Sequence, residues 1–210
     1  EELLADATFD VVGFLATEVA ENDTEAEELL FLTGSGSGEP LGILTHLTRL
    51  IAEGYTDLAA PVAAAATVTA NDVRLFPLTL PIKYRKDGSW LFNRAFLRKV
   101  AALRTEEGGA GTGEFMFQRS LALGLPNTLD GYAAVESEFY PDNVTAGAQG
   151  DPLATFGSLR HYWIVDRAQL TVRLLGELYA ETDEVGYKFH KRFDAAPVRA
   201  GAFRNMTRGA

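Results

Sequence analysis

The longest continuous pattern in the sequence is an acidic, helix-like stretch from Glu1 to about Leu32. Apolar residues recur in it at helical spacing, and carboxylates occupy much of the remaining surface. The apolar positions include Leu4, Ala7, Val11, Phe14, Leu15 and Val19, and the acidic ones include Glu18, Glu21, Asp23, Glu25, Glu27 and Glu28. Gly34 supplies a stop signal. The pattern therefore predicts one long helix that ends near Leu32.

Such a helix limits what the chain can fold into. About 30 helical residues span roughly 45 Å, whereas a compact domain of this length has a radius of gyration of about 17 Å. We expect the helix to project from a compact body or to act as a spine under other elements, and an extended spine suits an assembly. A helix broken at Gly13 or at Asn22–Thr24 fits the same residues and stays an open alternative.

The composition excludes several classes of protein. The chain has 210 residues, enough for one large domain or two small ones, and its net charge of −10 argues against affinity for nucleic acid. It contains no cysteine, so disulfides and thiolate metal sites are excluded. No signal peptide or membrane span is visible. Because the sequence begins at Glu1, inside a helical pattern, we expect that a segment upstream is missing.

The middle of the chain predicts short elements of both kinds. Asn71-Asp72 offers a helix cap, and Arg94–Arg104 has the pattern of an amphipathic helix. Short strands are expected at Trp90–Asn93, Phe115–Phe117 and Leu129–Val135, and the apolar run Tyr162–Val165 is typical of a central buried strand. Ile43–Ile51 is apolar but ambiguous in type, and Glu53–Ala70 has the composition of a link or an insertion.

The last part of the chain predicts two strands, each with one face in solvent. Apolar residues alternate with polar ones from Leu170 to Leu174 and again from Val185 to Phe193. The polar face of the second strand carries Lys188, His190 and Arg192. We hypothesise that this basic face pairs with the acidic helix of the same or a neighbouring subunit. With a helix first, mixed elements next and antiparallel strands last, the fold class is α+β.

No arrangement of residues predicts catalytic, cofactor-binding or metal-binding chemistry. The glycine-rich loop Gly34–Gly38 follows a helix and lacks a Walker lysine, so a flexible loop is the better interpretation. His46, His161 and His190 are scattered, without the close spacing of metal ligands. Three sequons, at Asn22, Asn143 and Asn205, have no secretory signal beside them and are interpreted as chance matches.

The order of several motifs resembles the major capsid protein of tailed bacteriophages, which has the Hong Kong phage capsid fold. The resemblance covers nearly the whole chain, although no single motif is a chemical site. The motifs are Glu2–Ala7, Phe31–Gly36 followed by Pro40–Leu44, Trp90–Asn93, Leu129–Tyr132, Phe156–Leu159 with Tyr162–Arg167, Tyr179–Thr182, Lys191–Asp194 and Ala202–Arg204.

This resemblance implies a structural, non-enzymatic protein without cofactors, which associates with copies of itself into pentamers, hexamers and an icosahedral shell around double-stranded DNA. Scaffold, maturation protease and portal proteins would be its further partners, the virion its location and the host cytoplasm its place of assembly. The implied division is a peripheral domain from residues 1–44 and 167–197, and an axial domain from residues 45–166 to which the terminal strand in 198–210 returns.

Some residues depart from the family pattern. Ser158 stands where an Asp is usual, and Asp130, Ala133 and Ala134 differ from the family's strand. With these departures a diverged prophage copy fits as well. We expect that the family's amino-terminal arm and extended loop, which precede the long helix, are missing from the given sequence. An encapsulin-like compartment shell is one alternative. A soluble acidic α+β enzyme or ligand-binding domain is another, and it would require a deep pocket lined by polar groups.

Overall fold

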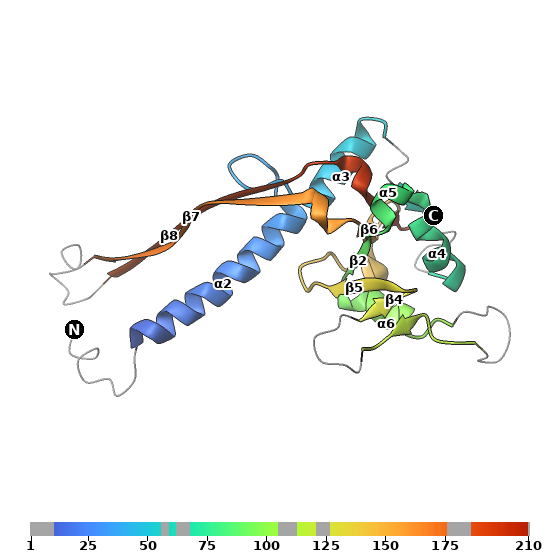
Figure 1. Ribbon diagram of the computed structural model, residues 1–210, viewed down its shortest axis with the longest axis horizontal. Coiled ribbons are helices and arrows are strands. Elements are labelled where there is room, and N and C mark those ends of the chain that lie inside the picture. The colour runs from blue at the N-terminus through green and yellow to red at the C-terminus, as the bar shows by residue number, and fades with distance from the viewer. Residues whose placement is uncertain are drawn as a thin grey trace.

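Two parts make up the molecule, a seven-stranded sheet with short helices and an extended unit of one helix beside two long strands (Figure 1). We describe them from a computed structural model, which places residues 11–55, 59–61, 68–104, 113–120, 127–175 and 186–209. The predicted beginning of the long helix and the motif at 179–182 lie outside these residues, as does most of the turn that the glycines in 108–113 predict. The mixture of helices and sheet agrees with the predicted α+β class.

The seven-stranded sheet is mixed, with strand order β1-β9-β6-β2-β5-β4-β3. The interior strand β6 pairs antiparallel with β2 on one side and β9 on the other, while β1–β9 and β2–β5 are parallel pairs. The strands are β1 Ala59–Pro61, β2 Ser89–Phe92, β3 Phe117–Gln118, β4 Thr128–Leu129, β5 Tyr132–Glu136, β6 Pro152–Gly157 and β9 Phe203–Thr207. We call this sheet with its surrounding helices the sheet body.

Short helices surround the sheet and complete its core. They are α3 Ile43–Ala52, α4 Ala70–Leu75, α5 Ile82–Arg85, α6 Arg94–Val100 and α7 Asn143–Ala146, with 3-10 turns at Phe76–Thr79, Leu159–His161 and Ala200–Ala202. Leu47, Val73 and Phe96, from α3, α4 and α6, are completely buried in the same apolar cluster as Trp90 and Phe156 of the sheet. Each buried side chain of this size contributes roughly 1.5–3 kcal/mol. The sheet body therefore has a core of its own.

The extended unit consists of α2 Val11–Thr33 and an antiparallel ribbon of β7 Tyr162–Leu175 and β8 Gly186–Pro197. Figure 1 shows both running side by side away from the sheet body. The long helix is confirmed over residues 11–33, and it is unbroken at both predicted break points. Within it, the side chains of Thr17, Asn22 and Thr24 donate to carbonyls four residues earlier, so these polar groups are satisfied inside the helix.

Three local predictions were wrong for identifiable reasons. Leu129–Val135 is a hairpin, because Asp130 and Gly131 have positive φ and form a two-residue turn between β4 and β5. The cap of α4 is Thr69, whose side chain and Asp72 form a capping box. The helix from Arg94 ends at Val100, and Arg104 instead bridges to Phe115. The ambiguous segment from Ile43 is the helix α3.

Candidate assembly surfaces

The inner face of the ribbon packs on α2. In β8 the side chains of Tyr187, Phe189, Lys191 and Phe193 are half-buried, whereas those between them are exposed. At the base of the ribbon, the ring of Phe31 lies 5.7 Å from that of Tyr162 and 5.9 Å from that of Phe193, both edge-on. Helix and ribbon therefore share one narrow apolar seam.

Lys191 joins the ribbon to the helix farther along this seam. Its Nζ lies 2.9 Å from Asp23 Oδ2 and also contacts Glu27 Oε1, and all three side chains are half-buried. Hydrogen bonds to Glu27, and then to Asp23, raise the pKa of Lys191. The sequence analysis did not single out this residue. Its alternation with Tyr187 and Phe189 along the strand already indicated that the three side chains share one face.

The hypothesis that Lys188, His190 and Arg192 pair with the helix is wrong within one chain. All three side chains are exposed on the other face of β8, away from α2. Pairing with a neighbouring subunit stays a prediction.

The prediction of a central buried strand at Tyr162–Val165 is also wrong. These residues begin β7, and Trp163, Ile164 and Val165 are 61%, 51% and 60% exposed. The buried central strand is β6, where five of the six residues are buried. Trp163 and Val165 lie on the face of the ribbon that points away from α2, and Ile164, on the opposite face beside the buried Ala195, is exposed as well. Trp163 and Val165 share one face, and large apolar side chains exposed together in this way mark an interaction site.

A tight loop joins α2 to α3 and connects the two parts of the molecule. A Cβ at Gly34 would lie 2.3 Å from the carbonyl oxygen of Pro40, and one at Gly42 would lie 2.5 Å from that of Leu32. Leu41 N donates to Ala195 O of β8, and Leu41 O accepts from the Tyr162 hydroxyl. The glycines therefore allow close backbone packing at a joint, which explains them without bound phosphate.

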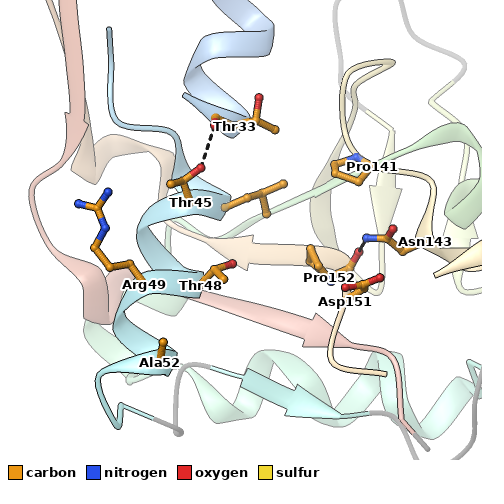
Figure 2. A pocket seen from close by; sticks show the side chains of 10 residues that line it. Thr33, Thr45, Thr48, Arg49, Ala52, Pro141, Asn143, Asp151 and Pro152 are labelled. Atoms are coloured by element: carbon orange, nitrogen blue, oxygen red, sulfur yellow. Dashed lines mark hydrogen bonds between the residues drawn. The ribbon is translucent and has the colours of Figure 1, made fainter. Parts of the chain in front are cut away.

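A shallow groove lies between α3 and the loop that precedes β6 (Figure 2). Thr33, Thr45 and Arg49 line one side, and Asn143 and Asp151 line the other. These polar groups are largely engaged with the backbone: Thr45 Oγ1 donates to Thr33 O, Arg49 to Ser35 O and Asn143 to Pro152 O. These three side chains thereby hold the backbone on both sides of the groove.

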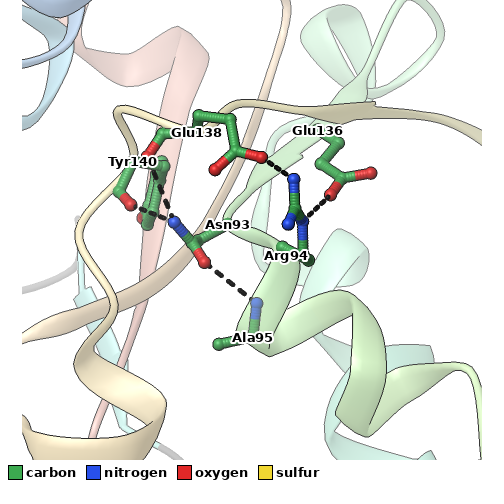
Figure 3. A network of polar contacts seen from close by, with 6 residues as sticks. All are labelled: Asn93, Arg94, Ala95, Glu136, Glu138 and Tyr140. Atoms are coloured by element: carbon green, nitrogen blue, oxygen red, sulfur yellow. Dashed lines mark hydrogen bonds and ion pairs between the residues drawn. The ribbon is translucent and has the colours of Figure 1, made fainter.

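Asn93 fixes the start of α6 and the chain beside it (Figure 3). Its Oδ1 accepts from Ala95 N as a helix cap, while its Nδ2 donates to Tyr140 O at 2.7 Å and to Glu138 O at 3.3 Å. Next to it, Arg94 pairs with Glu136 and Glu138 on the surface. The Trp90–Asn93 motif thus has a structural explanation: a buried strand ends in a residue that ties two segments together.

The buried polar groups of the sheet body form a hydrogen-bonded chain. Thr155 Oγ1 donates to Asn205 Oδ1 at 2.7 Å, so the hydroxyl of Tyr140, 3.1 Å from Thr155 Oγ1, must donate to it. Burial raises the pKa of Tyr140 well above its usual value, which keeps this donor protonated. Asn205 is itself buried in β9, so its sequon is inaccessible in the fold.

The three histidines are not brought together. His46 is half-buried on α3, where burial and then the charge of Arg49 lower its pKa. The ring of His161 packs edge-on against that of Tyr84, with 5.1 Å between the ring centroids. His190 is exposed on β8. Across the described residues, no group of three or more His, Asp or Glu side chains could hold a metal ion.

None of the helices described here is both long enough and apolar enough to cross a membrane.

Comparison with known proteins gives one family and one fold. The family model described as "Phage capsid family" matches residues 1–207. The capsid of the native GTA particle is 26% identical, with a TM-score of 0.78 over 100% of this chain and 69% of that chain. The capsid of the empty GTA particle is 23% identical, with a TM-score of 0.74 over 100% of this chain and 70% of that chain. A chain from Gordonia phage Cozz is 13% identical, with a TM-score of 0.56 over 100% of this chain and 67% of that chain. No curated protein matches the chain.

Proposed function

Because this chain belongs to the phage capsid family and is a structural major capsid protein of an icosahedral head, we propose that its copies associate into pentamers and hexamers that enclose double-stranded DNA. Its family and fold point to a structural role, to self-association and to a place in the virion capsid. We assign the peripheral domain to residues 1–44 and 167–197, and the axial domain to residues 45–166 and 198–210.

One observation carries this proposal: the extended unit exposes large apolar side chains that its own chain leaves uncovered. Trp163 and Val165 lie more than half exposed at the base of the ribbon, on a chain whose residues 1–207 match the family. Exposure of this kind favours association with another surface. The net charge of −10 supports enclosure of DNA without tight binding, because phosphate contacts require clustered Lys and Arg.

Electron microscopy of the concentrated protein tests the proposal. Closed shells of uniform size, or rings of five and six, are expected. We further propose that assembly takes place in the host cytoplasm, with scaffold, maturation protease and portal proteins as partners. Protein that stays monomeric at every concentration, also when co-expressed with a scaffold and protease, would overturn it. Nuclease protection of DNA inside purified shells tests the enclosed genome separately, and shells filled with protein cargo would instead support a compartment.

A further inference from the structure

The outer face of the ribbon is apolar at its base and basic toward its far end. Trp163 and Val165 of β7 lie at the base, followed on β8 by Arg192, His190 and Lys188, with Arg173 opposite Lys188. All six side chains are exposed. Asp194 also lies on this face, where its Oδ1 accepts from the backbone N–H of Ala195. We call Trp163, Val165, Arg173, Lys188, His190 and Arg192 the outer ribbon face.

A stripe of opposite character runs along the exposed side of α2. Glu18, Glu21, Glu25 and Leu29 are all exposed, and their spacing of three, four and four residues places them within about 80° of one another around the helix. Asp23 and Glu27, which hold Lys191, lie roughly on the opposite side of the helix. We call the first four residues the acidic helix stripe.

Within one chain these two surfaces point away from each other. The inner ribbon face and the Asp23–Glu27 side of α2 meet at Lys191, so the outer ribbon face and the acidic helix stripe lie on opposite outer sides of the extended unit. Neither surface can therefore satisfy the other without a second molecule.

The two surfaces match in length as well as in charge. Glu18 to Glu25 spans about 10 Å along the helix, and Lys188 to Arg192 spans about 13 Å along the strand. Leu29 lies about 6 Å beyond Glu25. Val165 is paired with Asp194, which lies about 7 Å beyond Arg192. One alignment therefore sets glutamates against basic side chains and Leu29 against Val165, with Trp163 about 7 Å farther toward the base of the ribbon.

We propose that the outer ribbon face of one copy docks on the acidic helix stripe of a second copy, an inference that rests on the self-association proposed above. The contact is heterologous, because the two surfaces differ and each copy offers one of each. It therefore links copies in series, into a ring or an extended array. The charged part gives register and salt dependence, and the apolar base supplies desolvated contact area.

A charge swap tests the contact. K188E with R192E reverses the outer ribbon face, and E21K with E25K reverses the acidic helix stripe. Each pair alone is expected to raise the protein concentration needed for assembly by roughly tenfold, whereas all four substitutions in one chain restore it toward the wild-type value. R98E with K99E on α6, which are also exposed, makes the same change of net charge elsewhere and serves as the control.

Site-specific cross-linking gives a second measurement. The chain has no cysteine, so E25C and R192C each introduce a single thiol. A short bismaleimide should link an E25C copy to an R192C copy in mixed shells, and not link two copies of either variant. Two results together would overturn the docking contact alone: normal shells from the charge-reversed variants, and no cross-link between E25C and R192C copies in mixed shells. Wild-type protein that forms no oligomer would overturn the proposed function, and this inference with it.

Discussion

The sheet body and the extended unit bury their apolar residues in different ways. In the sheet body, β6 has a paired strand on each side, and its inward side chains meet Trp90, Phe96 and Phe203 in one cluster. In the extended unit, a two-stranded ribbon has one face on α2 and the other in solvent, where Trp163 is 61% exposed.

This difference indicates which part of the molecule is complete alone. The sheet body has the layered arrangement of an independent domain, with apolar side chains enclosed between sheet and helices. The extended unit has a narrow seam fixed by Phe31 and Lys191 and one uncovered face. We therefore expect substitutions in the sheet body to change folding, and substitutions in the extended unit to change local order and assembly.

The largest effect is expected from Phe156→Ala in β6. Phe156 is completely buried, and its ring lies 5.0 Å from those of both Trp90 and Tyr132. Removing it leaves a cavity in the core, so urea unfolding should show a loss of about 3–5 kcal/mol in the free energy of unfolding. Phe115→Ala makes the same change at a side chain that is 48% exposed, and it should cost under about 1 kcal/mol. Equal losses would contradict the assignment of the core to β6.

The joint between the two parts is tested by Gly42→Ala. A Cβ there would lie 2.5 Å from Leu32 O and 2.6 Å from Gly34 N, so the backbone of the loop must shift. We expect a loss of about 1–3 kcal/mol and a changed angle between α2 and the sheet body, seen as a different scattering profile of the unassembled protein. In Gly201→Ala the nearest atom is Tyr84 Cε2 at 3.9 Å, an ordinary contact, so neither effect should appear.

The seam of the extended unit is tested by Lys191→Met. The variant loses both ion pairs and leaves Asp23 and Glu27 together without a cation, so at pH 8 we expect a loss of about 1 kcal/mol. Faster hydrogen exchange in α2 and β8, with unchanged exchange in β6, would locate the effect. Equal loss of protection in both parts would mean that the two parts unfold together.

The pH dependence of this seam follows from the raised pKa of Lys191. Because the folded-state pKa lies above the unfolded value of about 10.4, the stabilisation is fully present below that pH and is lost as the pH rises through the folded value. The difference in unfolding free energy between wild type and Lys191→Met should therefore shrink between pH 8 and pH 11. Lys191→Arg stays charged and should keep its advantage over Lys191→Met at pH 11.

Periodicity predicted those elements whose burial is decided within the chain. The alternation in Leu170–Leu174 and Val185–Phe193 identified both ribbon strands, and in β8 the apolar phase is half-buried while the polar phase is exposed. The same reasoning failed at Tyr162–Val165, since a run of apolar residues indicates burial on both faces, whereas Trp163, Ile164 and Val165 are all more than half exposed. What covers the other face cannot be read from the pattern of a single chain.

Two other features were misinterpreted, a hairpin turn and the role of Lys191. Asp130-Gly131 is a typical two-residue hairpin turn, yet the apolar residues around it favoured one continuous strand. Lys191 was overlooked among three neighbouring basic residues, because its role depends on which face of β8 meets the helix. That choice of face is made by tertiary packing of Phe31 against Phe193, between segments distant in sequence.

The smallest effect is expected at the edge of the sheet body, from Asp130→Asn. Asp130 has φ +49°, a conformation that Asn adopts at least as readily, and burial raises the pKa of its carboxyl while Arg74 opposes the rise. Removing the charge should therefore stabilise the hairpin at pH 7, by no more than about 0.5 kcal/mol because the side chain is partly solvated.

The sign of this effect is checked by pH. A raised folded-state pKa means that the wild type is penalised as the pH rises through that value, and that the penalty is absent below the unfolded value of about 3.9. The gain from Asp130→Asn in thermal unfolding should thus be present at pH 7 and vanish at pH 3. Asp130→Ala, which also removes the charge but tolerates positive φ poorly, should lose stability at both pH values. A loss with Asn at pH 7 would mean that the carboxylate itself holds this edge of the sheet, and that the sheet body depends on a charge at its rim as the extended unit depends on Lys191.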